Sequence, residues 1–301
     1  MSLLVTGSIA IDTVKTPFGV SEDCLGGSAV YFSMAASLFS PVRLLGVIGS
    51  DCLFDLAEVF AGRDVDLTGL EIRRGSKTFR WAGTYHEDIN ERTTDKLELN
   101  VLSEEPPTVP DSYKGSEFVF LANTAPALQL QLLEQIDKPS FVAADTMDCW
   151  ISGHLDDLKR LLKKIDALVI NEDEARMLAA ENNLIAAAEK ILDMGLSIVV
   201  VKKGESGSMI CNADGERFIL PAYPAAEVKD PTGAGDSFAG GLMGYLAKVG
   251  KVDFACLKQA IAYGTVVASF TIADFSLQRL TAIKRDDIES RFETLRKLTS
   301  F

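Results

Sequence analysis

The 301-residue chain is poor in cysteine and histidine, and neither residue type is clustered along it. Its two histidines, His86 and His154, are too few to build a histidine-based zinc site. The five cysteines are odd in number and form no C-x-x-C pair: Cys24, Cys52, Cys149, Cys211 and Cys256. This pattern is typical of reduced thiols in a cytosol rather than of a disulfide framework.

The sequence also lacks a long apolar run and any excess of basic residues. No run of about 18 apolar residues occurs, so no membrane-spanning helix is predicted. The N-terminal segment MSLLVTGSIAID lacks the basic region and the long apolar region of a signal peptide. Because 43 acidic residues outnumber 30 basic ones, for a formal charge of −13, the surface repels phosphate backbones and anionic lipids. We therefore expect a soluble, cytoplasmic protein without nucleic-acid or membrane partners.

Apolar residues make up 47% of the chain, which excludes general disorder, and they fall in a regular order. Short, continuously apolar runs predict strands that are buried on both faces: Leu3–Val5, Val42–Ile48, Phe118–Ala122, Phe141–Ala144, Ala167–Ile170 and Ile198–Val201. Segments with helical periodicity lie among them: Ala29–Phe39, Leu155–Lys164, Asp173–Ala180 and Ile185–Met194. Strands and helices in this order predict an α/β fold with a mostly parallel sheet.

Two other segments alternate between apolar and polar residues. They are Thr78–Tyr85 and Leu97–Val101, with the polar turn His86–Lys96 between them. A period of two residues is typical of a half-solvated antiparallel sheet. We expect a small inserted sheet, formed by about residues 12–20 and 76–102. Its role as a lid, as a dimerisation surface or as a structural addition stays open.

Polar residues follow four of the predicted strands directly. They are Asn123-Thr124, Asp145-Thr146, Asn171 and Lys202-Lys203-Gly204. In open parallel sheets, ligands bind outside the carboxyl ends of the strands. These residues are therefore candidate site residues, and Asn123 is a candidate substrate ligand.

The most informative segment is Asp230–Gly241, which reads D-P-T-G-A-G-D-S-F-A-G-G. Gly233 and Gly235 permit backbone conformations that other residues avoid, and the helical spacing of the next apolar residues predicts a helix from Ser237. A glycine-rich turn at a helix N-terminus exposes N–H groups at the positive end of the helix dipole, which suits a phosphate. Asp236 would repel that anion unless a neutral alcohol is held between the two.

Two familiar phosphate-binding patterns are absent from this segment. The P-loop pattern G-x-x-x-x-G-K-[ST] does not occur, and the pattern G-x-G-x-x-G fails at its third glycine, where Phe238 stands. A dinucleotide-dependent oxidoreductase is therefore disfavoured. The simplest structural alternative is that Asp236 only caps the helix and the glycines only form a tight turn.

Four motifs, in the right order, resemble those of the ribokinase-like, or PfkB, family of carbohydrate and nucleoside kinases. Asp230–Gly241 resembles the C-terminal signature of this family, and Gly26–Ala29 with Gly46–Asp51 resembles its N-terminal signature. Asn171–Glu174 resembles its N-x-x-E motif, and Val199–Gly207 resembles its nucleotide-binding strand and loop. The resemblance extends over essentially the whole chain.

This resemblance implies a three-layer α/β/α fold, with residues 1–301 in one domain and a small β-sheet lid inserted in it. It also implies a kinase that depends on Mg²⁺ and ATP and acts on an alcohol. Asp236 is the expected catalytic base. The backbone N–H groups of Gly233, Ala234 and Gly235 are the expected anion hole for the transferred phosphoryl group.

The resemblance further implies two cation sites. Asn171 and Glu174 would organise Mg²⁺ through water, although a Glu three residues after a helix-opening Asn is also a capping motif. Asp230 and Thr232 match positions that border a monovalent-cation site in family members. K⁺ therefore stays open as a second cation.

Substrate and nucleotide contacts are implied at further positions. Asp12, Gly26 and Gly27 match contacts to substrate hydroxyls, and a carboxylate can accept two hydrogen bonds from a vicinal diol. Ser28 and Tyr31 replace a Lys and an Asn that hold ribose in ribokinases, and Tyr31 could stack on a base, cover a sugar face or pack in the core. The expected nucleotide ligands are Asn171, Lys203, Gly204, Gly207, Thr232 and Thr265, although Lys203 also fits a solvated charge.

We therefore predict an ATP-dependent kinase that phosphorylates a primary hydroxyl of a sugar or related polyol. A nucleoside kinase on the same scaffold is the nearest alternative, and a non-catalytic sugar- or nucleotide-binding protein is the alternative from another class. Arg80 and Arg92 leave open a substrate that already carries a phosphate. A homodimer formed through the lid also stays open.

Overall fold

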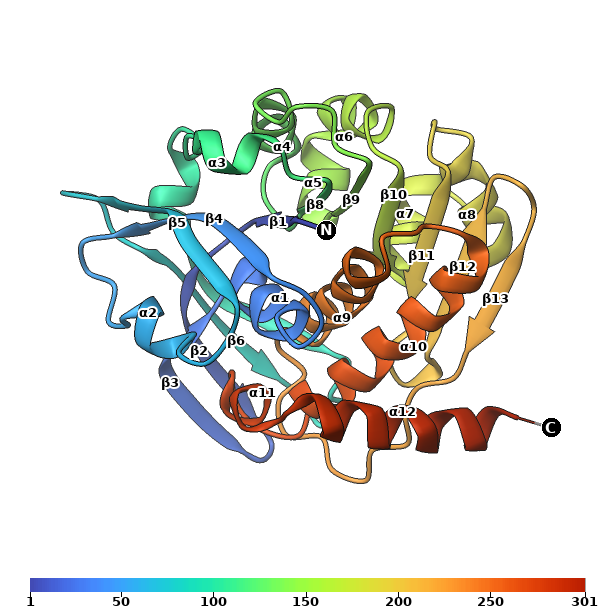
Figure 1. Cartoon of the computed structure of the whole chain (residues 1–301). Coiled ribbons are helices and arrows are strands. Elements are labelled where there is room, and N and C mark those ends of the chain that lie inside the picture. Colours follow the sequence, from blue (N-terminus) through green and yellow to red (C-terminus); the bar gives the residue numbers. More distant parts are fainter. Residues whose placement is uncertain (301) are drawn as a thin grey trace.

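The computed structural model describes residues 1–300 and is built around a nine-stranded sheet in the order β13-β12-β11-β10-β9-β8-β1-β4-β5 (Figure 1). The six strands predicted from apolar runs are confirmed: β1 (Leu3–Thr6), β4 (Val42–Gly49), β8 (Phe118–Leu121), β9 (Phe141–Asp145), β10 (Ala167–Asn171) and β11 (Ile198–Lys202). The sequence did not reveal the other three, which lie at the two edges: β5 (Val65–Arg73), β12 (Ser208–Asn212) and β13 (Arg217–Leu220). Strands β12 and β13 run antiparallel, and the others pair in parallel.

Helices cover both faces of this sheet and give the expected three layers (Figure 1). Successive residues of a strand point to opposite faces, so Leu3 and Val5 pack in one core and Leu4 packs in the other. The first core contains residues of α1 (Ser28–Ala36), α2 (Leu56–Val59), α9 (Ala234–Val249), α10 (Phe254–Thr271), α11 (Gln278–Ala282) and α12 (Arg285–Thr299). The second contains residues of α3 (Asp111–Lys114), α4 (Pro126–Leu133), α5 (Asp148–Gly153), α6 (Leu155–Leu162), α7 (Glu172–Ala179) and α8 (Leu184–Leu192).

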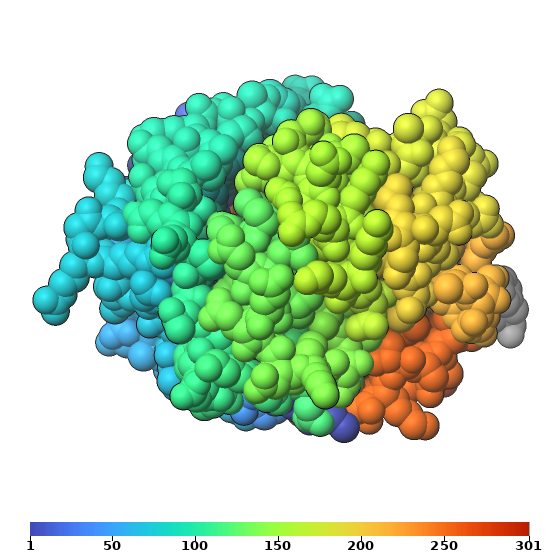
Figure 2. Space-filling model, turned by 90° about the horizontal axis from the view of Figure 1, so that it is seen from above, coloured from blue at the N-terminus to red at the C-terminus, as the bar shows by residue number. Residues whose placement is uncertain are grey.

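The second helical layer forms the surface that Figure 2 shows, in green to yellow. The four predicted helices are confirmed as α1, α6, α7 and α8, with ends that differ by a few residues at most. Across residues 1–300, none of the helices combines the length and the apolar character that crossing a membrane requires.

A separate four-stranded sheet, in the order β3-β2-β6-β7, forms the predicted small sheet. Its strands are β2 (Ala10–Thr16), β3 (Gly19–Gly26), β6 (Phe79–Tyr85) and β7 (Arg92–Glu98). The predicted antiparallel pairing is found between β2 and β3 and between β6 and β7, whereas β2 and β6, which come from distant segments, pair in parallel. In Figure 1 this sheet lies beyond one end of the large sheet.

The strand predicted at Leu97–Val101 was also misplaced. Strand β7 ends at Glu98, and a 3₁₀ turn, Asn100–Ser103, follows it. Six of the seven residues of β7 are exposed, so this edge strand has no buried face to produce an apolar period. Its polar residues therefore resemble a turn in the sequence.

Candidate active site

The glycine-rich turn at the start of α9 leaves two consecutive backbone N–H groups free. Gly233 caps the helix with a φ of 74°, in the left-handed region that favours glycine. The Ala234 N–H donates to the Pro231 carbonyl at 3.1 Å. Within residues 1–300, the N–H groups of Gly235 and Asp236 donate to no other residue, and neither does that of Gly233. The turn thus offers donors at 233, 235 and 236, whereas the donor of Ala234, which we expected to contribute, is already used.

Asp236 lies in the first turn of α9, because the helix begins at Ala234 rather than at the predicted Ser237. The prediction failed because the first turn lies at the site, so its side chains add nothing to the apolar pattern of the core. Burial raises the pKa of the Asp236 carboxyl, while the positive charges of Lys202 and Arg92 lower it.

The ring of Tyr31 packs against the glycine turn at Gly233. A Cβ placed on Gly233 would lie 2.4 Å from Cγ of the Tyr31 ring, and Tyr31 is only 2% exposed. Of the three roles left open for this residue, the structure therefore shows packing in the core. Ser28 is occupied as well, because its hydroxyl accepts from the Ser8 N–H at 3.1 Å. Both side chains thus have structural partners, and a role of Ser28 or Tyr31 in substrate binding stays a prediction.

Three strand ends present polar side chains to α9. Directly paired residues of parallel strands share a face, and Asp145 pairs with Val169 while Asn171 pairs with Lys202. Val169 belongs to the core that α9 covers. Asp145, Asn171 and Lys202 therefore all lie on the face of the sheet where α9 begins.

Lys202 lies against the glycine turn itself. Its Nζ would be 2.9 Å from a Cβ placed on Gly235, so the missing side chain of this glycine makes room for the ammonium group. Burial raises the pKa of the Glu174 carboxyl, and burial raises that of Asp145 well above the usual range, with the Asp236 charge adding to the rise. The charge of Lys202 opposes both shifts. Sequence analysis counted Lys202 among the candidate residues at the strand ends but gave it no specific role.

Asn171 and Glu174 form the capping box that was the alternative to a metal role. The Glu174 N–H donates to Asn171 Oδ1 at 2.8 Å, and the Asn171 N–H donates to Glu174 Oε2 at 3.0 Å. The cap leaves Glu174 Oε1 available, and the buried Oδ1 of Asp145 has no hydrogen-bond partner in the described part of the chain. Both are carboxylate oxygens, which Mg²⁺ prefers as ligands. Nevertheless, no cluster of three metal-binding side chains occurs within residues 1–300.

Asp12 lies on β2 at the other side of the turn. It is 4% exposed, and its Oδ1 has no hydrogen-bond partner among the described residues. Burial, with the charges of Asp230 and Asp236, raises its pKa to about 8. Gly26 must lack a side chain here, because a Cβ on it would be 1.8 Å from Asp12 Oδ2. An unpaired buried oxygen of this kind fits the expected role of Asp12 as an acceptor for substrate hydroxyls.

The paired glycines have different surroundings. Gly27 caps α1 with a φ of 98°, and a Cβ on it would lie 2.4 Å from the Ser8 carbonyl oxygen. Its glycine is therefore required by the backbone, whereas that of Gly26 is required by the Asp12 carboxylate.

Asp230 holds the signature loop in place. It is 1% exposed, and its two oxygens accept the N–H groups of Thr232 at 2.9 Å and Ser276 at 3.2 Å. The Thr232 hydroxyl donates to the Tyr85 hydroxyl of β6 at 3.2 Å, so the small sheet contacts the loop. Both residues have clear structural partners, and their expected role beside a monovalent cation stays a prediction.

A cavity of about 480 Å³ opens beside the turn, within the range of small-molecule sites. Its walls include the expected nucleotide residues Gly204, Gly207 and Thr265, together with Gly235. Lys202 lines this cavity and Lys203 does not, which favours the solvated alternative for Lys203. Ile89 and Asn90, in the turn between β6 and β7, close the cavity from the side of the small sheet.

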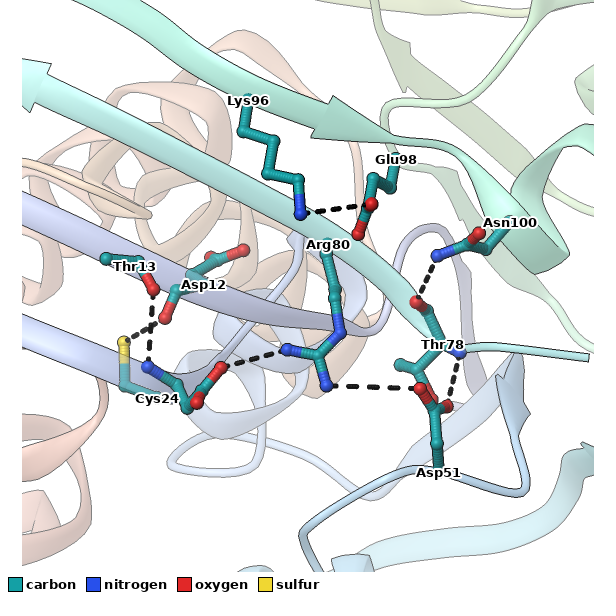
Figure 3. A network of polar contacts seen from close by, with 10 residues as sticks. Asp12, Thr13, Cys24, Asp51, Thr78, Arg80, Lys96, Glu98 and Asn100 are labelled. Atoms are coloured by element: carbon teal, nitrogen blue, oxygen red, sulfur yellow. Dashed lines mark hydrogen bonds and ion pairs between the residues drawn. The ribbon is translucent and has the colours of Figure 1, made fainter.

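Two other polar candidates, Asn123 and Arg80, already have partners in the fold. Asn123 Oδ1 accepts from the Trp150 indole N–H at 2.8 Å. Arg80 forms an ion pair with Asp23 at 2.9 Å and lies 3.9 Å from Asp51; Figure 3 shows the contact with Asp51. Trp81, the next residue of β6, pairs with Asp12 and shares its face of the sheet. Because successive residues of a strand point to opposite faces, Arg80 points away from the site. Arg80 is therefore not available for a substrate phosphate.

Fold and site together define a small-molecule kinase, with an anion turn, an acidic side chain within it and a nucleotide-sized cavity beside it. The chain belongs to the pfkB family of carbohydrate kinases, whose model matches residues 25–283. It is thus an ATP-dependent carbohydrate or nucleoside kinase, and kinases of this family use ATP with Mg²⁺.

Individual relatives agree with this assignment. A cytidine kinase from Thermococcus kodakarensis is 29% identical over 251 residues, which cover 81% of this chain and 88% of that enzyme. A nucleoside kinase from Burkholderia thailandensis, solved with inosine, is similar in fold with a TM-score of 0.78 and 21% identity, over 97% of this chain and 98% of that one. The ribokinase II structure from E. coli with ATP and Mg²⁺ has a TM-score of 0.77 and 18% identity, over 97% and 99%.

Proposed function

We propose that this kinase transfers the γ-phosphate of ATP to a primary hydroxyl of a sugar or nucleoside, with Asp236 as the base. The observation that carries the proposal is the position of the Asp236 carboxyl in the first turn of α9, next to the free N–H groups of residues 235 and 236. A hydroxyl between the carboxylate and this turn would face the phosphate that the turn holds.

The residues around Asp236 suit phosphoryl transfer through a loose transition state, in which positioning and charge stabilisation dominate. Asp236 needs only to orient the hydroxyl and accept its proton late in the reaction. The free N–H groups at the turn stabilise charge on the transferred group. Asp12 accepts hydroxyls of the substrate and fixes which one reaches Asp236.

Magnesium would be held on the side of the sheet, where Glu174 and the unpaired oxygen of Asp145 lie. The ion would supply positive charge to the phosphates of ATP. The capping box orients the Glu174 carboxylate for this purpose. A K⁺ ion beside Asp230 and Thr232 stays a separate prediction, because both of their side chains already have partners.

A nucleoside is the second candidate substrate class. Two relatives are named as kinases of ribosides. They are the cytidine kinase, whose match covers 81% of this chain, and an aminoimidazole riboside kinase from Salmonella typhimurium, whose match covers 40%. On the protein side, Trp81 pairs with Asp12 across the small sheet and therefore lies on the same face, where it provides an aromatic surface. This arrangement supports a ribosyl group at Asp12 with a planar base beside it.

The test is an ADP-release assay with Mg²⁺ and ATP against free pentoses and hexoses, their phosphates, and the common nucleosides. We expect turnover with at least one sugar or nucleoside, and its loss with Asp236→Asn. Turnover on free sugars alone would remove the nucleoside candidate. An absence of turnover on every acceptor, in a folded protein that binds ATP, would contradict the proposed function.

A further inference from the structure

One wall of the 480 Å³ cavity is a segment with few backbone contacts of its own. Residues 221–228 follow β13, lie outside every helix and strand, and contribute several lining residues, Tyr223 among them. Within residues 1–300, their backbone groups form no hydrogen bond, and the next one along the chain joins the Lys229 N–H to the Ile272 carbonyl at 2.8 Å. The position of this segment therefore depends on its side chains.

Tyr223 joins this segment to the C-terminal helix α12 through Arg291. The guanidinium carbon of Arg291 lies 4.7 Å from the centroid of the Tyr223 ring and 3.5 Å from that of the Phe270 ring. The same guanidinium donates to the Ser269 hydroxyl at 2.9 Å. Phe270 and Ser269 belong to α10, against which α12 packs (Figure 1). Arg291 thus contacts the segment and α10 at the same time.

The two parts that Arg291 joins are both walls of the cavity. Tyr223 lines it from the segment and Ser269 lines it from α10, whereas Arg291 and Phe270 do not line it. Arg291 therefore lies behind the lining, where it can set the distance between two walls without touching a ligand. A guanidinium suits this place because its planar faces stack on aromatic rings while its edge donates hydrogen bonds, which an ammonium group cannot combine.

The chemistry of these walls indicates which part of the nucleotide they receive. The glycine turn, which lines the cavity at Gly235, offers backbone N–H groups that suit the phosphates. The segment and α10 offer mainly apolar groups: Ala222, Pro224, Ala225, Val228, Ala268 and Ile272. Apolar walls bind a planar base by burying its faces rather than by charge. We therefore expect Arg291 to affect the base and not the phosphates.

We propose that Arg291 is a positioning residue of the nucleotide site: by joining Tyr223 to α10, it holds the wall of the cavity that receives the base of ATP. The inference rests on the proposed function, since it requires that ATP occupies this cavity. It gives α12, none of whose residues line the cavity, a part in donor binding.

The test measures the binding of ATP and AMP by calorimetry, with Mg²⁺ present. Arg291→Met keeps a long apolar side chain and removes the guanidinium, and Arg291→Lys keeps the charge without the planar group. Arg279→Met is the matched control. The exposed Arg279 lies 5.9 Å from the centroid of the same Phe270 ring, and within residues 1–300 it has no such contact with Tyr223.

We expect Arg291→Met to weaken ATP and AMP by the same factor, about 3- to 30-fold, which is the range for one or two cation–π contacts. The factor is the same because both nucleotides carry the same base. Arg291→Lys should behave like Arg291→Met, and Arg279→Met like the wild type. In steady-state kinetics the KM for ATP should rise, while kcat and the KM for the acceptor change by less than about twofold.

A double-mutant cycle tests whether Arg291 acts through Tyr223. Tyr223→Ala removes the ring that Arg291 holds, so this variant should bind ATP more weakly than the wild type. Adding Arg291→Met to Tyr223→Ala should then weaken ATP binding by less than about a further twofold.

Unchanged nucleotide affinities in Arg291→Met would overturn the proposal, and so would full additivity in the cycle or a loss of ATP affinity without a loss of AMP affinity. An equal loss in kcat and in acceptor affinity would also overturn it, because the effect would then be on the fold as a whole. If Arg291→Met does not fold, Arg291→Lys takes its place in the same cycle. Failure of the proposed function would appear separately, as absent turnover in a wild type that still binds ATP.

Discussion

Asp12, Asp145 and Asp236 are three carboxyl groups withdrawn from water around a single turn, and burial is the main cause of the raised pKa of each. An arrangement of this kind is unfavourable in the free protein, because like charges are held close together in a poorly solvated place. In the proposed site, ligands would relieve it: substrate hydroxyls at Asp12 and Asp236, and a magnesium ion at Asp145. The residues proposed to do the chemistry are therefore also those that destabilise the empty site.

The first prediction concerns Asp236→Asn. The amide keeps the shape of the side chain but cannot accept the proton of the substrate hydroxyl, so turnover should fall by about 10²- to 10⁴-fold. ATP affinity should stay close to that of the wild type, since the backbone donors of the turn remain. Steady-state kinetics and calorimetry measure the two quantities. Turnover within threefold of the wild type would remove Asp236 from the mechanism.

A second prediction follows from the pKa of Asp12, which is raised from 3.8 to about 8. Between these pH values the folded protein holds a proton at Asp12 that the unfolded chain has released, so the free energy of unfolding falls as the pH rises. Asp12→Asn does not titrate. The difference in Tm between Asp12→Asn and wild type should therefore shift in favour of the variant from pH 5 to pH 8.

Thermal unfolding of both proteins, without ligands, at several pH values measures this difference. A constant difference across the range would show that Asp12 is ionised in the folded protein. The variant should lose affinity for the acceptor most clearly above pH 8, where Asp12 of the wild type is a carboxylate that can accept two hydroxyls.

At the scale of elements, the small sheet is joined to the site at two places. The Tyr85 hydroxyl of β6 accepts from Thr232, and Asn90 in the next turn lies against the nucleotide loop, with its Oδ1 3.3 Å from the position of a Cβ on Gly204. The sheet therefore touches both the signature loop and the 480 Å³ cavity. These contacts favour the role of a lid among those left open by the sequence.

The third prediction tests that role. The His86 N–H donates to the Glu91 carbonyl at 3.1 Å, so residues 87–90 close a loop that an Asn-Gly hairpin turn can replace. Removing Ile89 and Asn90 in this way opens the cavity to water. We expect ATP hydrolysis without acceptor to rise relative to acceptor phosphorylation. An unchanged ratio of the two rates, at unchanged Tm, would contradict a lid.

The elements also show how far the sequence predicted the structure. Strands such as β1 and β10 were recognised because both of their faces are buried, which leaves an unbroken apolar run. The exposed edge strand β7 and the first turn of α9 were misplaced, because neither has a face in the core.

Within the site, the motifs located Asp12, Asp236 and the glycine turn, since these depend on short spacings. Lys202 was given no specific role, and the core packing of Tyr31 was only one of three roles left open. Their surroundings, Gly235 and Gly233, come from residues far along the chain, and only the folded structure brings each pair together.

At the scale of the whole molecule, α9 connects the acceptor side to the nucleotide side. Its first turn carries the proposed anion site, and its glycines allow it to lie directly on α1, which is capped by Gly27, an expected substrate contact. A Cβ on Gly240 would be 2.5 Å from the Phe32 carbonyl oxygen, and one on Gly244 would be 2.9 Å from Ala36 Cα. The distance between these two helices is therefore set by glycines in the middle of α9.

The last prediction is that Gly240→Ala destabilises the protein and impairs catalysis together. The new methyl group meets a backbone atom of α1, which cannot rotate away, so the free energy of unfolding should fall by about 1–3 kcal/mol. Because the helix that moves carries Asp236, turnover should fall as well, and more than the affinity for AMP. Gly153→Ala is the matched control, since a Cβ there has no neighbour within 4 Å, and it should change stability by less than about 0.5 kcal/mol. Denaturant unfolding and steady-state kinetics measure both effects; a Gly240→Ala variant as stable and as active as Gly153→Ala would show that the α1–α9 contact does not position the site.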